Sequence, residues 1–508
     1  MEARIDGAIV LVGFMGAGKS TGARAIAAEL GGTAVDSDRE LELALGEPIE
    51  AFFDREGEDA YRAREEEMVC ELLDRGDAAV IALGGGAVRS ERVREALIRH
   101  TVVHLDIDPD SAWRRASGKG RPLARDPARF AQLHGDRASL YETVADVLMP
   151  PGERDALRRA LPYVQALRDA PPGTRLLWAV TASGDYPVYL GNGLIEARFF
   201  PPVHGRRHVV TDENVAIAQP VEGDNRILVA AGEEHKTLQA AEHVLRSLAQ
   251  AGAERSDLVV AVGGGVVGDL AGFCASVYQR GIGHVQVPTT LVAQVDSAYG
   301  GKTGVDLPEG KNYAGAYHQP AAVLCDPAAL RTLPPAEVAA GYAEVVKTAL
   351  IAGGPLWARV RQGQAPGPRE IMGCVRTKLT VVAEDERDGG RRQVLNLGHT
   401  VGHAIEAATG YARYRHGEAV GIGLLAALRL SGREALRAEV ADLLAARGLP
   451  LVFAGARVEH VLNRIEHDKK RAGGRVPFVL VEAPGAVTPG HPVDPVRLRE
   501  AVEEVHER

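Results

Sequence analysis

The sequence has few cysteines, no long apolar run and no excess of positive charge. Its four cysteines form no CxxC pair, which excludes a disulfide framework and a cysteine zinc knuckle: Cys70, Cys274, Cys325 and Cys374. No apolar run approaches the roughly 20 residues of a membrane span. The first apolar segment leads directly into a glycine-rich loop, so we expect no signal peptide and a cytoplasmic protein. The net charge of -9 argues against nucleic-acid binding, although small anions can still bind in local basic pockets.

The length and the proline pattern indicate several domains. With 508 residues, 45% of them hydrophobic and 25% charged, the chain is an ordinary globular protein with room for about three compact units. Proline pairs lie at Pro150-Pro151 and Pro171-Pro172, and a helix between them is expected to break or kink at Pro162. We predict an α/β unit over residues 1–165, a linker over 166–176, a second α/β unit over 177–330 and a mainly helical unit over 331–508.

A phosphate-binding loop lies near the start of the chain. A predicted strand over Ala8–Val12 ends at Gly13-Phe-Met-Gly-Ala-Gly-Lys-Ser20, the full G-x-x-x-x-G-K-S pattern, and a helix is predicted over Thr21–Leu30. In this context backbone N–H groups surround the phosphates, the lysine reaches the β and γ oxygens, and the serine meets Mg²⁺. The predicted ATP site comprises Gly13, Gly16, Ala17, Gly18, Lys19, Ser20 and Thr21.

Two later strands in this unit also end in distinctive residues. The strand Thr33–Val35 leads to Asp36-Ser-Asp38, which taken alone is more typical of a helix cap. The strand Ala79–Leu83 leads to Gly84–Gly86, which permits close approach of a ligand to the backbone. Charged residues complete the unit: a helix face at Tyr61–Glu65, Arg121 in a Gly/Lys/Arg-rich lid, and Arg137 where a further helix begins.

In this order and spacing the segments resemble shikimate kinase over the whole unit. The resemblance implies ATP- and Mg²⁺-dependent phosphorylation of the shikimate 3-hydroxyl, a reaction that depends on positioning and charge neutralisation. It implies that Asp38 holds the diol and acts as base, and that Ser20 and, through water, Asp36 hold Mg²⁺. The remaining implied roles are carboxylate binding by Arg62 and Arg137, substrate lining by Gly84, Gly85 and Gly86, and closure over the phosphate by Arg121.

The second unit alternates strands and helices, which predicts a largely parallel sheet. The predicted strands are Val188–Leu190, His208–Thr211, Ile227–Ala230, Leu258–Val262 and His284–Val287. Gly263–Asp269 follows a buried strand and opens a helix, so its amides suit a pyrophosphate, although the strict G-x-G-x-x-G spacing is absent. Farther on, Lys302, Lys311 and Asn312 lie among glycines and small hydroxyl residues, which indicates an anion site.

The helical unit contains a possible metal site. His399 and His403 are four residues apart in Leu395–Glu406, which is predicted as helix, so both rings lie on one face. They could chelate one metal together or pack as polar residues against the core. Glu344 and Lys347, on a predicted helix over Glu337–Ile351, are usually a surface pair at this spacing, but their neighbours are apolar.

The second and third units closely resemble 3-dehydroquinate synthase, a family that uses NAD and a divalent metal, Zn²⁺ or Co²⁺. The resemblance implies a metal held by Glu344, His399 and His416, with His403 as hydrogen-bond donor and proton shuttle. The implied NAD contacts are Asp212, Glu233, Lys236, Gly264, Gly265, Asp269, Thr289, Thr290 and Thr332. The implied substrate contacts are Arg280, reaching across a dimer interface, Asp296, Lys302, Lys311, Asn312, Lys347, Lys378, Arg392, Asn396 and Lys469, of which Lys302 and Lys347 are also expected to be catalytic.

The resemblance also implies the chemistry. NAD takes a hydride from the C5 carbon, phosphate leaves by β-elimination, the same NADH returns the hydride, and an intramolecular aldol reaction closes the ring. The expected protein is a fused kinase and cyclase of the shikimate pathway that acts on small molecules. Two alternatives remain open: another sugar phosphate cyclase or metal-dependent polyol dehydrogenase, and an N-terminal unit that only senses ATP.

Overall fold

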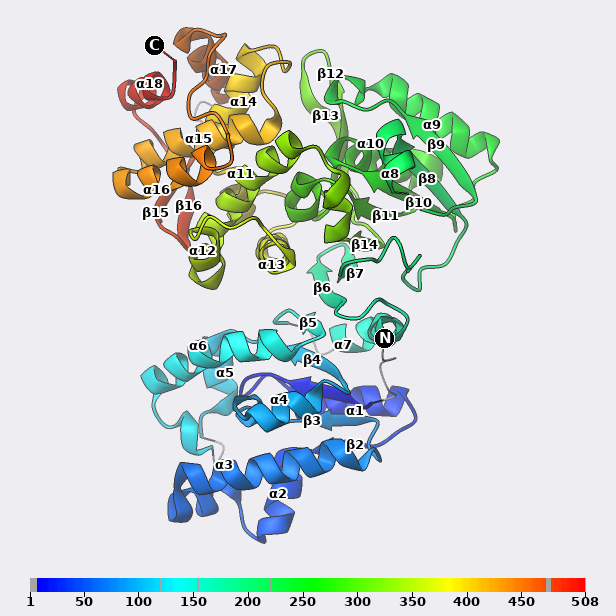
Figure 1. The fold of residues 1–508 in the computed structure, drawn as a ribbon, viewed down its shortest axis with the longest axis vertical. Helices are drawn as coiled ribbons and strands as arrows, with labels where there is room; N and C mark the ends of the chain where they lie inside the picture. The colour runs from blue at the N-terminus through cyan, green and yellow to red at the C-terminus, as the bar shows by residue number, and fades with distance from the viewer. Residues whose placement is uncertain (1–6, 119–120, 153–154, 220, 472–476, 508) are drawn as a thin grey trace. The chain divides into compact units, whose positions relative to one another are not determined.

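The computed structural model describes residues 7–118, 121–152, 155–219, 221–471 and 477–507, with the backbone alone at 122 and 467–471. The chain forms two compact units, Met1–Val180 with Pro187–Gly191, and Thr181–Tyr186 with Asn192–Arg508 (Figure 1). Among the described residues, no helix is long and apolar enough to cross a membrane. All four cysteines are free and buried.

The first unit is a parallel sheet flanked by helices (Figure 1). Its strand order is β2-β3-β1-β4-β5-β6, and every neighbouring pair is parallel. The strands are β1 (Ile9–Val12), β2 (Ala34–Asp36), β3 (Val80–Ala82), β4 (Thr101–Leu105), β5 (Val147–Met149) and β6 (Arg175–Thr181), with β7 (Gly184–Leu190) next in the chain. The helices are α1 (Lys19–Glu29), α2 (Ser37–Leu45), α3 (Ile49–Arg75), α4 (Glu91–Leu97), α5 (Pro109–Ala116), α6 (Pro127–Val144) and α7 (Ala156–Gln165). The apolar residues of β1 are buried, as the predicted strand requires.

Two helix predictions in this unit were wrong in detail. The helix that carries Arg137 begins ten residues earlier, at Pro127, because Asp126 caps it by accepting from the N–H groups of Ala128 and Arg129. Pro162 lies inside α7 and does not end it. Pro162 has no N–H to donate to the carbonyl of Arg158, four residues earlier. Arg158 is exposed to water, and burial of the apolar face of α7 offsets the lost hydrogen bond.

In the second unit, parallel strands lie in the order β14-β11-β10-β8-β9. Its strands are β8 (Arg207–Asp212), β9 (Asn225–Val229), β10 (Leu258–Gly263), β11 (Gly283–Pro288) and β14 (Ala322–Cys325), so the four strands predicted between 208 and 287 are confirmed. The helices of this part are α8 (Glu213–Ala218), α9 (Leu238–Gln250) and α10 (Gly265–Val277). A hairpin that the sequence pattern did not reveal, β12 (Lys302–Leu307) with β13 (Gly310–Tyr317), carries Lys302, Lys311 and Asn312.

The rest of the second unit is mainly helical, as predicted (Figure 1). Its helices are α11 (Pro335–Ala352), α12 (Gly354–Val360), α13 (Pro368–Glu384), α14 (His399–Ala408), α15 (His416–Leu430), α16 (Glu434–Ala445), α17 (Val458–Arg471) and α18 (Pro495–Glu504). One hairpin interrupts them, formed by β15 (Phe478–Ala483) and β16 (Ala486–His491).

The helix with the two histidines is shorter than predicted. Residues Arg391–Asn396 form a 3-10 turn, and Gly398 has φ +78°, a left-handed conformation that suits glycine, so α14 begins at His399. A Cβ on Gly423 of α15 would lie 2.9 Å from the N atom of Gly402. Glycines on α14 and α15 therefore allow these helices to pack closely, which brings His399 and His416 together.

Candidate active sites

The phosphate loop of the first unit has the conformation that nucleotide binding requires. Gly16 and Gly18 have φ of +85° and +93°, and α1 begins at Lys19. The Lys19 ammonium donates to the carbonyls of Gly13 (2.8 Å) and Phe14 (3.2 Å), so it lies over the loop. Burial lowers the pKa of Lys19 to about 8, although Asp38 opposes the shift. A glycine-rich turn between a strand and the amino end of a helix is an arrangement that binds phosphates.

The two aspartates after β2 have different surroundings. Asp36 caps α2 by accepting from the N–H of Asp38 (3.1 Å) and of Arg39 (3.4 Å), as the capping interpretation expected. The Oδ1 atom of Asp38 is buried and has no hydrogen-bond partner among the described residues. Burial, with Glu65 and Asp36 nearby, raises the pKa of Asp38 to about 6. Asp38 therefore has an unused acceptor and the basicity that a proton acceptor needs.

Two arginines lie beside the glycine-rich segment after β3. Arg62 Nη1 contacts Glu65 Oε2 at 2.5 Å, and Arg137 Nη1 donates to the Gly85 carbonyl at 3.0 Å. The Nε and Nη2 of Arg137 are buried without hydrogen-bond partners among the described residues, and the Nε of Arg62 lies 3.5 Å from Oε1 of Glu58. Two such guanidiniums suit a planar carboxylate. Sequence reasoning missed Glu65, which is 3% exposed and holds Arg62; its place in the Tyr61–Glu65 face was the available signal.

Glycine is required where the backbone passes these side chains. A Cβ on Gly84 would lie 2.6 Å from Oε1 of Glu65, and a Cβ on Gly86 would lie 2.6 Å from Cζ of Arg62. Arg121 is exposed, and its positive charge contributes to the lowered pKa of Lys19. It therefore lies close enough to the phosphate loop to interact with it electrostatically. Residues 119–120 of the predicted lid lie outside the described residues.

In the second unit, the predicted dinucleotide residues gather at the carboxyl ends of β8, β10 and β11. Helix α10 begins at Gly265, directly after β10, so its amino end faces the sheet edge. A Cβ on Gly264 would lie 2.8 Å from the methyl group of Thr290, so this backbone passes Thr290 closely. The Oγ1 of Thr289 is buried and has no partner among the described residues. This edge therefore fits a dinucleotide phosphate.

Other residues of this predicted set lie in local contacts. Lys236 is 3% exposed, and its Nζ lies 2.7 Å from Glu233 Oε1 and 3.4 Å from Asp269 Oδ2. Asp212 caps α8, and Thr332 accepts a hydrogen bond at 3.1 Å from Gln219 next to the same helix.

Glu344, His399 and His416 converge from three helices, α11, α14 and α15. The Oε1 atom of Glu344 lies 3.7 Å from Nε2 of His399 and 3.5 Å from Nε2 of His416. Glu344 is fully buried, and besides the two imidazoles its carboxylate meets Lys347, whose Nζ lies 2.5 Å from Oε2. Nδ1 of His399 is 3.2 Å from the Leu397 carbonyl, which directs Nε2 towards Glu344. A buried carboxylate facing two imidazole nitrogens is a donor set that fits a divalent metal.

His403 and Asp296 lie beside this set. The ring of His403 is 5.1 Å from that of His399 and 5.7 Å from that of His416, between centroids. Among the described residues, two groups have their possible ligand atoms within 4.8 Å of one another: His399, His403 and His416, and Asp296, Glu344 and His399. His399 is buried, whereas His403 is exposed. Geometry alone thus permits both interpretations of the histidine pair.

The charges in this centre perturb one another strongly. Burial, reinforced by Lys347, lowers the pKa of His399 to about 3. Burial alone would also lower the pKa of His416, but hydrogen bonds to Glu344 and Glu406 raise it to about 10. Lys347 is 1% exposed, with its Nζ 2.5 Å from Glu344 Oε2, so the pair is a buried feature of the site and not a surface ion pair.

The predicted substrate lysines are paired with acidic side chains. Lys347 lies 3.3 Å from Asp296, and Lys378 also contacts Asp296. Lys302 pairs with Asp388 at 2.5 Å, and Lys311 pairs with Glu406 at 3.0 Å. The sequence pattern indicated an anion site at Lys302 and Lys311, and in the structure both ammonium groups are paired with carboxylates of the chain itself.

The other predicted substrate residues differ in how the structure places them. Arg392 is buried, with Nη2 2.9 Å from the Gly300 carbonyl, and the N–H of Asn312 donates to Asp306 at 2.7 Å. Arg280 is exposed, and the contacts described for Arg280 and Asn396 include no member of the metal cluster. The side chain of Lys469 lies outside the described residues.

Sequence reasoning missed Glu406, the last residue of the stretch Leu395–Glu406. Its side chain is 2% exposed and lies between Lys311 and His416. Burial alone would raise the pKa of Glu406, but the hydrogen bond with His416 helps to lower the pKa to about 2. Its position seven residues after His399, on the same helix face, was the signal that could have identified it.

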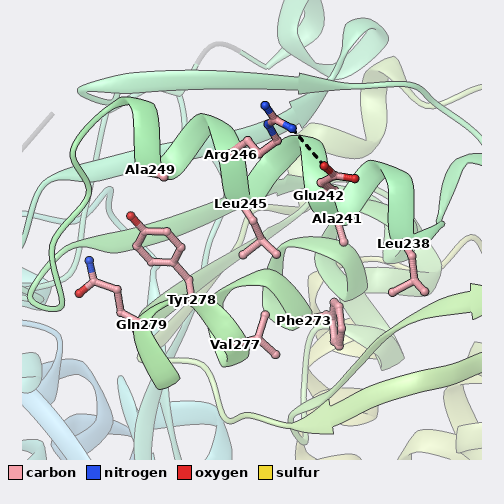
Figure 2. A pocket seen from close by; sticks show the side chains of 10 residues that line it. All are labelled: Leu238, Ala241, Glu242, Leu245, Arg246, Ala249, Phe273, Val277, Tyr278 and Gln279. Atoms are coloured by element: carbon pink, nitrogen blue, oxygen red, sulfur yellow. Dashed lines mark hydrogen bonds and ion pairs between the residues drawn. The ribbon is translucent and has the colours of Figure 1, made fainter.

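A separate apolar hollow of about 520 Å³ lies between α9 and α10 (Figure 2). Its lining includes Leu238, Leu245, Phe273, Val277 and Tyr278. None of the predicted site residues lines it.

Three family models match the chain. The shikimate kinase model covers residues 15–168, and the N-terminal and C-terminal models of 3-dehydroquinate synthase cover 226–340 and 341–471. A 3-dehydroquinate synthase of Halorhodospira halophila is 42% identical over 333 residues, which are 61% of this chain and 94% of that protein. Another, of Gloeobacter violaceus, is 47% identical over 291 residues, 54% of this chain and 80% of that protein.

The chain is also similar to a solved structure. A crystal structure of 2-deoxy-scyllo-inosose synthase complexed with carbaglucose-6-phosphate, NAD+ and Co2+ has a TM-score of 0.58 and 25% sequence identity. The similarity covers 65% of this chain and 99% of that one.

Proposed function

The chain belongs to the 3-dehydroquinate synthase family and also carries a shikimate kinase domain, and on this premise we propose which residues perform the two reactions. One activity phosphorylates shikimate with ATP to give shikimate 3-phosphate. The other converts 3-deoxy-D-arabino-heptulosonate 7-phosphate to 3-dehydroquinate with release of phosphate. The cyclase uses NAD with Zn²⁺ or Co²⁺, and the kinase uses ATP with Mg²⁺.

The observation that carries the cyclase assignment is the buried Glu344 carboxylate facing Nε2 of both His399 and His416. These three residues would hold the divalent metal and leave positions open for substrate oxygens. When bound, the metal polarises neighbouring substrate oxygens, and NAD accepts and returns a hydride. NAD would lie at the amino end of α10, against Gly264, Gly265 and the unpaired hydroxyl of Thr289.

Side chains around the metal site would orient the keto-sugar acid phosphate. Lys302, Asn312, Asn396 and Lys469 would hold its phosphate, and Lys378 and Arg392 its carboxylate. Asp296, Lys311 and Lys347 would bind its hydroxyls. His403, exposed beside the metal ligands, would donate a hydrogen bond to the phosphate and move a proton as it leaves.

The kinase assignment rests on the two arginines and Asp38 around Gly84–Gly86. The guanidinium groups of Arg62 and Arg137 would bind the substrate carboxylate. Asp38 would hold the diol and accept the proton of the 3-hydroxyl. Lys19 and Arg121 would neutralise the transferred phosphate, and Ser20 and Asp36 would hold Mg²⁺.

Substitution of Gly86 by alanine should raise the KM for shikimate at least about tenfold, because the added methyl group would displace the Arg62 guanidinium. The loss of one hydrogen bond to a charged group has an effect of this size. Steady-state kinetics at saturating ATP measure the change. Gly135→Ala is a matched control, because a Cβ at Gly135 meets no atom within 4 Å. An unchanged KM in Gly86→Ala would remove Arg62 from the carboxylate site.

The two activities should be separable by one substitution. Lys19→Ala removes the ammonium over the phosphate loop, so ADP formation from ATP and shikimate should be abolished while phosphate release by the cyclase persists. Purified protein is assayed with ATP, Mg²⁺ and shikimate, and separately with the keto-sugar acid phosphate, NAD and Zn²⁺. Parallel loss of both activities would refute independent domains, and steady NADH accumulation would indicate a dehydrogenase.

The domain limits and the assembly are also part of this proposal. We place the kinase at 1–165, the linker at 166–176, the NAD domain at 177–330 and the metal domain at 331–508. Arg280 is exposed and would reach the substrate phosphate of a second copy in a cytoplasmic homodimer.

A further inference from the structure

We propose that Glu406 is a positioning residue that orients the metal ligand His416 and, through its second oxygen, the substrate lysine Lys311. This inference rests on the proposed cyclase function and extends it to a residue outside the assigned set. Glu406 itself would touch neither the metal nor the substrate.

The position of Glu406 on α14 brings it to the metal site. His399, His403 and Glu406 are separated by four and three residues, so they share one helix face. The Glu406 side chain is 2% exposed, although a lone carboxylate is costly to bury. Among the residues that the structure describes, its carboxylate has two hydrogen-bond partners, Lys311 and His416. Both partners belong to the proposed site.

Glu406 determines which nitrogen of His416 is available to a metal. Its Oε2 lies 3.4 Å from Nδ1 of His416, while Nε2 of the same ring lies 3.5 Å from Glu344 Oε1. An imidazole that donates Nδ1–H to a carboxylate keeps the lone pair on Nε2, the nitrogen that faces Glu344. His399 is oriented in the same way, but by the Leu397 carbonyl. The two histidine ligands thus depend on different supports, and only that of His416 is charged.

The other oxygen of Glu406 ties the β12–β13 hairpin to α14. Lys311 Nζ lies 3.0 Å from Oε1 of Glu406 and 3.8 Å from Oε1 of Glu233. The same ammonium lies 4.8 Å from the ring centre of Tyr411. With Glu406 neutralised, Lys311 would be left with Glu233, so it would move from the position proposed for a substrate hydroxyl.

The test compares wild type with Glu406→Gln, Glu406→Asp, Lys311→Met and the double variant Glu406→Gln/Lys311→Met. The dissociation constant for Zn²⁺ is measured by competition with a chelating dye, and KM and kcat are measured with saturating Zn²⁺ and NAD. An uncharged amide can accept from only one of the two partners at a time, so Glu406→Gln should weaken Zn²⁺ binding by about 10- to 100-fold, as loss of such a support typically does. Glu370→Gln is the matched control, because Glu370 pairs with Arg359 and caps α13, and Zn²⁺ affinity should stay at the wild-type value.

The double variant separates the two roles. Glu406→Gln should weaken Zn²⁺ binding even when Lys311 is already replaced, because the effect on the metal passes through His416. Glu406→Gln should also raise KM, because Lys311 moves. In the double variant this increase should not add to the increase caused by Lys311→Met, because both act through Lys311. If Glu406→Gln does not fold by circular dichroism, Glu406→Asp decides, since its shorter chain cannot reach both partners.

If a folded Glu406→Gln or Glu406→Asp protein binds Zn²⁺ as tightly as the wild type does, the inference is overturned. The cyclase function would still hold, provided that the wild-type protein releases phosphate. Failure of the wild type to release phosphate would instead refute the proposed function.

Discussion

His399→Ala should lose its divalent metal during gel filtration, whereas His403→Ala should retain the metal and turn over slowly. His399 is buried, and its Nε2 lies 3.7 Å from the buried carboxylate oxygen Oε1 of Glu344. His403 is exposed on the next helical turn, where it can meet a substrate phosphate. If His403 moves a proton during elimination, its loss should lower kcat by about 10²- to 10⁴-fold.

The measurement is metal content per chain by elemental analysis, followed by phosphate release with added Zn²⁺. Excess Zn²⁺ should partly restore His399→Ala, because Glu344 and His416 remain, and should not restore His403→Ala. His243→Ala is a suitable control, because His243 lies on α9 and contacts the Leu228 carbonyl. Equal metal loss in both site variants would mean that His399 and His403 chelate one ion together, which the spacing of their ligand atoms permits.

Asp38→Asn should lower kcat of the kinase by about 10²- to 10⁴-fold, the typical contribution of a positioned general base. The buried Oδ1 of Asp38 has no partner among the described residues, and burial raises the pKa of this carboxyl to about 6. An amide at this position keeps the size of the side chain but cannot take the proton of a hydroxyl. The shikimate KM should change less than kcat, because Arg62 and Arg137 remain.

Kinetics of ADP formation at saturating shikimate measure this effect, and phosphate release by the cyclase in the same preparation is the internal control. Asp54→Asn, a change at a carboxylate that pairs with Arg125 at the surface, should leave kcat unchanged. A kcat of Asp38→Asn within threefold of wild type would show that Asp38 only positions the substrate.

Local patterns were sufficient where a function depends on consecutive residues. The phosphate loop, its preceding strand and its following helix could be predicted because glycine spacing, a buried β-branched run and a helix start are all local properties. The parallel strands β8–β11 could be predicted for the same reason. The start of α14 was misplaced, because only close packing against α15 explains a left-handed Gly398.

Several chemical groups of this protein could be recognised from the sequence: a phosphate loop, a glycine-rich helix start, two spaced histidines and a Glu/Lys pair among apolar residues. How these groups combine depends on the packing of distant segments. Glu344, His399 and His416 lie on three helices, and their spacing along the chain carries no information on whether the side chains meet. The helix face shared with His399 could have indicated Glu406, but not its partners. These are 95 and 10 residues away, and the packing of the hairpin and α15 against α14 brings them to one carboxylate.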